Sequence, residues 1–119
     1  MALVFPASVT VLTPATSANL GPGFDSLGLA LQLYNRFQVE ESGVNPALPT
    51  IDVQGALGAE LSTGSDNLFF RSFALLFERQ QVELPAVRIR MMIQIPPGCG
   101  LGSSATAVVG GLVAANEML

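Results

Sequence analysis

The sequence contains no lysine and no histidine, and this double absence excludes several mechanisms. A Walker phosphate-binding loop requires its lysine, and a protein kinase requires a lysine on one of its strands. The Ser-His-Asp triad and histidine-rich metal sites require imidazole. Any chemistry performed by these 119 residues therefore uses carboxylates, hydroxyls, amides, backbone N–H groups or a bound ion.

Charged residues and cysteine are also scarce. Only 12% of the residues are charged although 50% are hydrophobic, and the formal net charge is −4. An acidic chain lacks the basic face that holds a nucleic-acid backbone, so we expect no nucleic-acid partner. The single cysteine, Cys99, cannot form a disulfide within the chain, which favours a reducing, cytoplasmic setting. With so few charges, we expect part of the surface to be covered by a partner or by further polypeptide.

Long hydrophobic runs are missing as well. No apolar run reaches the roughly 18 residues that a membrane span needs, so we expect no membrane partner. Residues 1–12 are apolar but have no basic flank, because the first positive residue is Arg36, and they do not resemble a signal peptide. The length is that of one compact domain.

The first half of the chain shows mainly strand patterns. We expect a strand at residues 9–13, which Pro14 ends, and then a turn-rich segment at residues 14–28. Two further strands are expected after it, separated by the polar residues 34–36, and they can form a hairpin. Leucines alternate along residues 27–33, and Phe37 and Val39 continue the same period of two.

The second half alternates strands with helices. After a loop at residues 45–49, residues 51–54 are expected to form a short strand. Ser65 or Asp66 is expected to cap a helix. Its apolar stripe would consist of Leu68, Phe69, Phe73, Leu76 and Phe77.

The clearest strand pattern follows Pro85, where apolar residues alternate over positions 87–95. A glycine-rich loop comes next, and a second helix is expected from about Ser103. Its core-facing residues would be Val108, Val109, Leu112 and Val113. Residues 116–119 offer no helix stop signal, so we expect the chain to end within this helix.

The order strand, glycine loop, helix favours an anion site. A helix start carries about half a positive charge and up to four unpaired N–H donors. Glycines let the backbone approach a phosphate closely, and the hydroxyls of Ser103 and Ser104 can cap the helix, bind a phosphate oxygen or touch a phosphate-bound Mg²⁺. Two alternatives stay open. The loop can be a tight connection with capping serines, or a loose dinucleotide-binding pattern, although no suitable acid follows at the required distance.

Two separate segments resemble the GHMP small-molecule kinase family. Residues 96–105, PPGCGLGSSA, are similar to the second GHMP motif, P-x-x-x-G-L-G-S-S-A. Residues 14–28, PATSANLGPGFDSLG, resemble the first motif in the form in which it occurs in homoserine kinases. Mevalonate and galactose kinases do not usually carry that form, so the first motif selects the homoserine kinase branch. The likeness is weakest between residues 41 and 65.

The resemblance implies an α+β fold with a two-layer arrangement of a sheet and helices, like the ribosomal protein S5 domain 2. Residues 1–119 would form a truncated amino-terminal, ATP-binding GHMP domain. The family's third glycine-rich motif and its carboxyl-terminal domain would be absent, together with the acid that helps to hold Mg²⁺. We expect negligible phosphorylation of homoserine by the isolated chain.

The implied reaction is ATP-dependent phosphorylation of L-homoserine to O-phospho-L-homoserine, a step of threonine biosynthesis, with Mg²⁺ as cofactor. Such phosphoryl transfer needs mainly positioning and charge stabilisation. The family motifs map the substrate site onto Asn19 and Asp25. No residue is assigned as a general base, because an ordinary aspartate is a poor proton acceptor for an alcohol. The resemblance also implies a homodimer as the expected state of the full-length protein.

The residues that the resemblance assigns to ATP are Pro96, Pro97, Gly98, Cys99, Gly100, Leu101, Gly102, Ser103, Ser104, Ala105 and Thr106. Ser104 is also the candidate for contact with the metal ion. Asn67 is a further candidate near adenine, although an N-cap explains it equally well. For Asn19 and Asp25 the alternative is an ordinary turn, and for Cys99 it is a small loop residue rather than a reactive thiol.

Two other functions stay open. One is a different GHMP kinase, such as a mevalonate-type enzyme. The other is a non-catalytic remnant that acts as an interaction module through an exposed apolar face.

Overall fold

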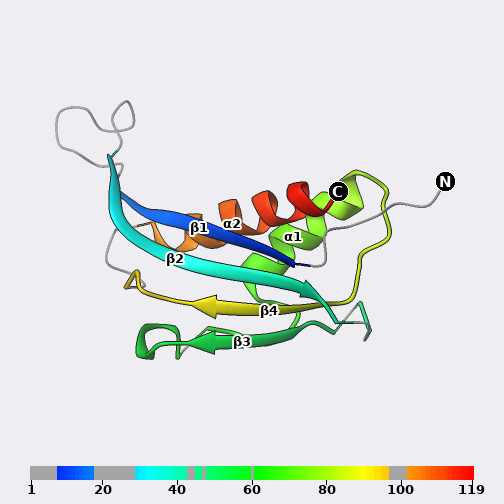
Figure 1. Ribbon diagram of the computed structural model, residues 1–119, viewed down its shortest axis with the longest axis horizontal. Coiled ribbons are helices and arrows are strands. Elements are labelled where there is room, and N and C mark those ends of the chain that lie inside the picture. Colours follow the sequence, from blue (N-terminus) through cyan, green and yellow to red (C-terminus); the bar gives the residue numbers. More distant parts are fainter. Residues whose placement is uncertain (1–7, 18–28, 43–44, 47, 60, 97–101) are drawn as a thin grey trace.

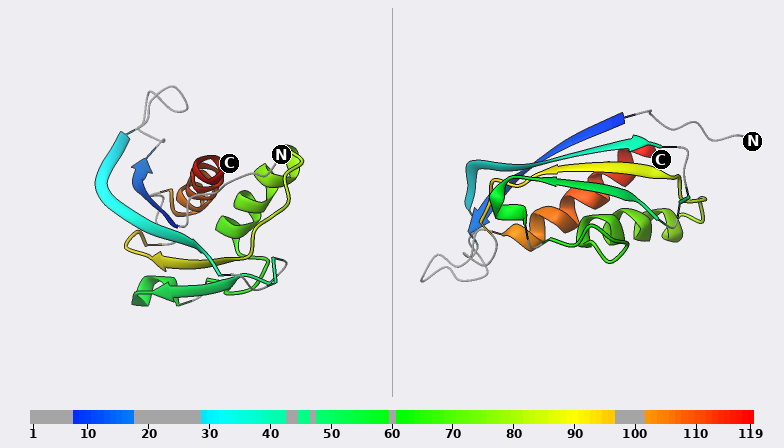
Figure 2. Two further views of the ribbon diagram at one scale, coloured as in Figure 1. Left: turned by 45° about the vertical axis from the view of Figure 1, so that its right-hand side comes forward. Right: turned by 90° about the horizontal axis from the view of Figure 1, so that it is seen from below.

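The computed structural model of the chain describes residues 8–17, 29–42, 45–46, 48–59, 61–96 and 102–119. Four strands form one sheet in the order β1-β2-β4-β3. The pairs β1–β2 and β2–β4 are antiparallel, whereas β3 and β4 are parallel. Both helices lie on one face of this sheet, and the opposite face carries no described element (Figures 1 and 2). The expected two-layer α+β arrangement is therefore confirmed.

Strand β1, Ser8–Ser17, runs past Pro14, so the prediction that this proline ends the strand is wrong. β1 is an edge strand with β2 as its single neighbour in the sheet. Proline is tolerated there because its missing N–H need not face a partner strand. The pairing with β2 shifts register between Pro14 and Thr16, which is the irregularity that such a proline accompanies.

Strand β2, Leu29–Glu41, is continuous, so the prediction of two strands separated by polar residues 34–36 is also wrong. The period of two continues through that segment. Asn35, Phe37 and Val39 are all buried on the helix side, while Arg36 is exposed on the other. The polar residues do not break the strand because the side chain of Asn35 finds partners in the interior, as described below.

The next two strands follow the sequence pattern closely. β3 is Thr50–Gln54 and β4 is Val87–Met92, which ends three residues before the alternating pattern does. In β4 the residues alternate between buried and exposed, and Val87, Ile89 and Met91 point into the core. A 3₁₀ turn, η2 (Ala56–Gly58), follows β3. Because β3 and β4 are parallel, the chain must cross over between them, and the crossover contains the first helix.

Helix α1, Leu68–Arg79, begins one residue later than an N-cap at Asp66 predicts and two later than one at Ser65, so the prediction of either residue as the N-cap is wrong. Its N-cap is Asn67, whose Oδ1 accepts a hydrogen bond from the N–H of Phe70 at 3.2 Å. The expected stripe is buried at Phe69, Phe73 and Phe77, and Leu68 is 38% exposed.

Helix α2, Ser103–Met118, starts where the sequence predicts, but it buries a different face. The four apolar residues expected in the core, Val108, Val109, Leu112 and Val113, are 36–50% exposed. The buried residues are Thr106, Gly110, Gly111, Ala114, Ala115 and Met118. Glycine and alanine let α2 lie close to α1 and to the sheet, and this close approach decides which face is covered.

Candidate functional site at the start of α2

A cavity of about 280 Å³ lies where β2, the end of β4, the start of α1 and the start of α2 meet. Its apolar wall consists of Phe37, Leu61, Leu68, Phe69, Met91, Ile93 and Ala107. Its polar wall consists of Asn35, Ser62, Asp66, Asn67, Ser103, Ser104 and Thr106. Four residues predicted to bind ATP therefore line one cavity, although Asn67 lies far from the others in the sequence. An apolar pocket with a few converging polar groups is the usual form of a small-molecule site.

The helix start at this cavity has free backbone donors. Gly102 is the N-cap of α2 with φ 75° and ψ 29°, and no described side chain caps the helix. The first intrahelical bond runs from the N–H of Thr106 to the carbonyl of Gly102 at 2.9 Å. The N–H groups of the first turn and the positive end of the helix dipole are therefore directed at the cavity end, where Ser104 is exposed. This arrangement can hold an anion.

Gly102 also joins the two sequence segments that carry the family motifs. A side chain at this position would overlap the hydroxyl of Thr16, which belongs to the first motif, and would lie 3.5 Å from the Thr16 backbone nitrogen. The positive φ is a second reason for glycine here, because side chains rarely adopt it. Residues 14–17 and the start of α2 are thus in contact, as a shared site requires.

Asn35 fixes the position of the α2 start, and sequence reasoning missed it. Its Nδ2 donates to Oγ1 of Thr106 at 3.0 Å, and its Oδ1 accepts from the N–H groups of Gln94 and Ile95 at 2.9 and 3.0 Å. Thr106 Oγ1 in turn donates to the carbonyl of Ser103 at 2.7 Å. One buried amide therefore ties β2, the segment after β4 and the first turn of α2 together. The sequence did contain an indication of this role, because Asn35 is a polar residue at a position where the alternating pattern of β2 otherwise places apolar, core-facing residues.

Asn67 acts as a structural residue in this cavity wall. It is 5% exposed, its Oδ1 caps α1, and its Nδ2 donates to the carbonyl of Ser62 at 2.8 Å. The N-cap interpretation is therefore confirmed. A contact between Asn67 and adenine stays a prediction.

The remaining predicted residues divide into two groups. Pro96 is half-buried after β4, and Ala105 is exposed in the first turn of α2. The others lie outside the described residues: Asn19, Asp25, Pro97, Gly98, Cys99, Gly100 and Leu101.

Metal ligands are few in the part of the chain that the structure describes. It contains no group of three histidine, cysteine, aspartate or glutamate side chains that could hold an ion. Asp66 is the carboxylate in the cavity wall, and its Oδ1 accepts a hydrogen bond from the hydroxyl of Ser62. Among the described residues, no helix has the length and apolar character to cross a membrane.

Sequence comparison relates this arrangement to known proteins. Residues 67–119 match the family described as the GHMP kinases N terminal domain. A homoserine kinase of Nostoc punctiforme is 44% identical over 115 residues, which cover 94% of this chain and 36% of that protein. The chain therefore spans about a third of the length of such relatives.

Solved structures share the fold. A homoserine kinase from Cytophaga hutchinsonii has a TM-score of 0.81 at 28% identity, covering 94% of this chain and 35% of that one. The Methanococcus jannaschii mevalonate kinase has a TM-score of 0.70 at 17% identity, covering 91% and 39%, which shows a common fold alone. The chain is thus similar to homoserine kinases over about a third of their length, and its residues 67–119 match the GHMP kinases N terminal domain.

Proposed function

We propose that this chain is the nucleotide-binding part of a kinase that phosphorylates L-homoserine. The observation that carries the proposal is the start of α2, which no side chain among the described residues caps, beside a cavity that is apolar on one side and polar on the other. A nucleoside triphosphate needs both surfaces, because its base is flat and largely apolar whereas its phosphates are charged. Homoserine kinases from three organisms share 44–46% of their residues with the chain over the matched region.

The triphosphate would lie at the first turn of α2. The N–H groups of Ser103, Ser104 and Ala105 are the backbone donors there, and the Ser104 hydroxyl adds another. This mode of binding would allow a chain without lysine to hold polyphosphate, because main-chain donors and the helix dipole replace an ammonium group. The base would contact the apolar wall formed by Phe37 and Phe69.

Mg²⁺ fits this site only in part. The Ser104 hydroxyl is an oxygen ligand of the hard type that Mg²⁺ prefers, and the ion usually keeps several waters and binds substrate phosphates. When bound, it would neutralise charge on the phosphates. We assign no carboxylate ligand to it.

Homoserine would bind near the first-motif residues Asn19 and Asp25. The Asp25 carboxylate can pair with the substrate ammonium, and the Asn19 amide can bind its hydroxyl. The substrate oxygen forms a bond to the γ-phosphorus, the bond from that phosphorus to ADP breaks, and the hydroxyl proton passes to the transferred phosphoryl oxygen. No protein base is needed, and the product, O-phospho-L-homoserine, serves threonine biosynthesis.

A chimera tests this proposal. This chain replaces the matching 115 residues of the Nostoc punctiforme homoserine kinase, and the purified chimera is assayed with ATP and Mg²⁺ on L-homoserine and on mevalonate. We expect phosphorylation of homoserine and little of mevalonate. Ser104→Ala should lower kcat/KM about tenfold or more, because it removes a donor to the transferring phosphates.

Ser65→Ala is the matched control, since Ser65 is exposed before α1 and does not line the cavity. It should leave kcat/KM unchanged. A folded chimera, verified by circular dichroism, that prefers mevalonate would favour the other GHMP kinase. A folded chimera that phosphorylates neither alcohol and does not bind ATP would contradict the proposal.

A further inference from the structure

The sheet face opposite the helices carries three of the five arginines of an acidic chain. Arg36 lies on β2, and Arg88 and Arg90 lie on β4. All three are exposed. Among the described residues this face carries two carboxylates against three arginines, so it is locally basic although the chain has a net charge of −4. Its two carboxylates, Glu40 and Asp52, are both beside Arg88 and Arg90 in the strand register.

The strand register defines how these side chains are placed. Across β1, β2, β4 and β3, one row is Leu12, Arg36, Met92 and Gln54, and the next is Thr10, Gln38, Arg90 and Asp52. Arg36 and Arg90 are therefore diagonal neighbours on adjacent strands. Diagonal residues are about 7–8 Å apart at the backbone, which long side chains can span.

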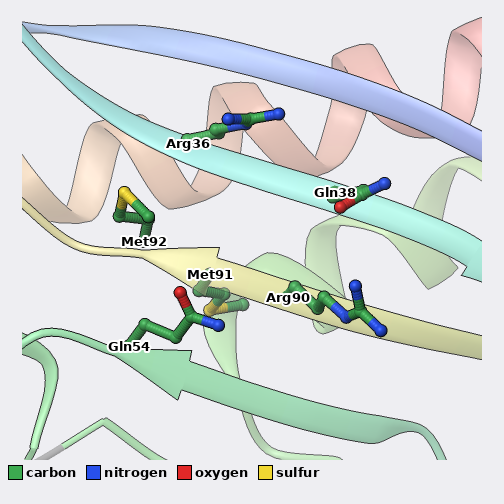
Figure 3. A pocket seen from close by; sticks show the side chains of 6 residues that line it. All are labelled: Arg36, Gln38, Gln54, Arg90, Met91 and Met92. Atoms are coloured by element: carbon green, nitrogen blue, oxygen red, sulfur yellow. The ribbon is translucent and has the colours of Figure 1, made fainter.

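The two diagonal arginines share one pocket. It has a volume of about 220 Å³ and is lined by Arg36, Gln38, Gln54, Arg90, Met91 and Met92. Figure 3 shows these side chains arranged around it, with contributions from β2, β3 and β4. Two guanidinium groups and two amides provide hydrogen-bond donors, and none of these lining residues carries a carboxylate.

Neither arginine is held by a strong ion pair among the described residues. Arg90 lies 3.9 Å from Glu40, and the two side chains are 45% and 33% exposed. An exposed pair of this length contributes little. In the register, Arg36 lies between Leu12 and Met92, which are uncharged. Arg36 therefore has no charged neighbour in its row, whereas Arg90 lies opposite Asp52 and near Glu40, and an external anion would compete with these two carboxylates for it.

We propose that this pocket binds a small oxyanion-bearing molecule between Arg36 and Arg90. The shared chemistry is a phosphate or carboxylate group that accepts hydrogen bonds from the two guanidinium groups. Arginine suits this task because its planar donors match both groups geometrically. Met92, which is 40% exposed, offers a short apolar contact beside the anion. This pocket lies on the opposite face of the sheet from the cavity at α2, and Met91 is the one lining residue that the two share.

Titrations followed by ¹H–¹⁵N NMR of the 119-residue chain test the proposal. The two probes are inorganic phosphate and succinate, each at constant ionic strength, so that phosphate and carboxylate are distinguished. We expect saturable shifts of the Arg36 and Arg90 side-chain Nε–H signals with at least one probe. Arg36→Gln and Arg90→Gln should each weaken that binding about tenfold.

Arg88→Gln is the matched control. It removes the same charge from the same face, but Arg88 does not line the pocket, so binding should change less than about twofold. The spectra also show whether each variant is folded. Absence of saturable shifts at Arg36 and Arg90 with both probes would overturn the proposal, and so would equal weakening by Arg88→Gln and Arg36→Gln, which indicates only general charge attraction.

Discussion

The two helices cover the same face of the sheet with opposite kinds of residue. α1 buries phenylalanines, with Phe69, Phe73 and Phe77 fully covered. α2 buries mainly glycine and alanine, with Met118 near its end, and leaves Val109, 50% exposed, at the surface. Phe37 stacks on Phe69 with ring centroids 4.5 Å apart, so the aromatic core continues from the sheet into α1. Burial in α2 therefore follows how closely a face can approach its neighbours rather than how hydrophobic it is.

The close approach is visible at the glycines of α2. A side chain at Gly111 would overlap the carbonyl of Phe69 and lie 3.0 Å from the Phe73 nitrogen. At Gly110 it would lie 3.0 Å from the ring of Phe37. Valine or leucine on this face would push the helices apart and open voids around the phenylalanines, and tight packing disfavours voids.

The helix starts differ as well. In α1 the Asn67 side chain satisfies an N–H of the first turn, whereas no described side chain does so in α2. Within the part of the chain that the structure describes, the start of α1 is therefore capped, whereas the start of α2 has no side-chain cap and lies beside a cavity. The start of α2 is the one for which we propose nucleotide binding.

The largest loss of stability is expected when a phenylalanine that α1 contributes to the core is shortened. Phe73→Ala should lower the free energy of unfolding by about 4 kcal/mol, because it removes a fully buried ring that lies 5.0 Å from that of Phe77 and leaves a cavity. Urea denaturation measures the change. Leu75→Ala, on the exposed side of α1 at 45% exposure, should cost less than about 1 kcal/mol. Equal costs would contradict the assignment of faces.

Adding one carbon to α2 is the converse test. Gly111→Ala should destabilise the chain by about 2 kcal/mol, because overpacking against the α1 backbone outweighs the better helix propensity of alanine. The sign is informative, since the same substitution at an open helix position stabilises by about 1 kcal/mol. Val113→Ala, on the exposed side of α2, is the control and should change stability little. A gain in stability for Gly111→Ala would show that the two helices are farther apart than described.

Loss of the hydrogen bond of Thr106, a buried polar residue of α2, should lower stability less than a change in the packing of this helix. Thr106→Val removes the partner of the Asn35 amide and should cost about 1.5 kcal/mol in urea denaturation. Thr13→Val is the matched control. The Thr13 hydroxyl is buried and has no hydrogen-bond partner among the described residues, so its loss should leave stability unchanged or raise it. Similar losses at both threonines would mean that Thr13 also has a partner.

The smallest effect concerns the helix starts. Asn67→Ala should lower the free energy of unfolding by about 1 kcal/mol through loss of the N-cap of α1. Ser103→Ala at the start of α2 should stay within about 0.5 kcal/mol, because its side chain makes no cap bond. Thermal unfolding followed by circular dichroism compares the two. A larger loss for Ser103→Ala would indicate that α2 is capped after all.

Local signals predicted several elements well. Alternation after Pro85 located β4, residues 51–54 fell within β3, and the glycine and serine residues before α2 marked its start at Ser103. Each of these signals acts over a few neighbouring residues. The predicted strand end at Pro14 and the predicted strand break around Asn35 were wrong because both predictions considered only neighbouring residues. The tolerance of Pro14 and Asn35 depends on an edge position in the sheet and on partners 59–71 residues away.

The candidate site, like the fold, was predicted from the sequence only in part. Asn67, Ser103, Ser104 and Thr106 were each identified from sequence, but nothing in their spacing showed that they line one cavity. Asn35, which holds the α2 start in place, was not identified, because its role is a set of long-range hydrogen bonds. The roles predicted for Asn19 and Asp25 stay predictions.

By itself, the sequence determined the alternation of strands and helices, the chemistry excluded by the missing lysine and histidine, and the glycine start of α2, because these depend on backbone preferences and residue types. Only the tertiary structure decided that α2 turns its glycines inward and its valines outward, and that Thr16 meets Gly102. The physical reason is distance: which side chains fit between two elements depends on how closely their backbones approach, and that spacing is set jointly by residues far apart in the chain.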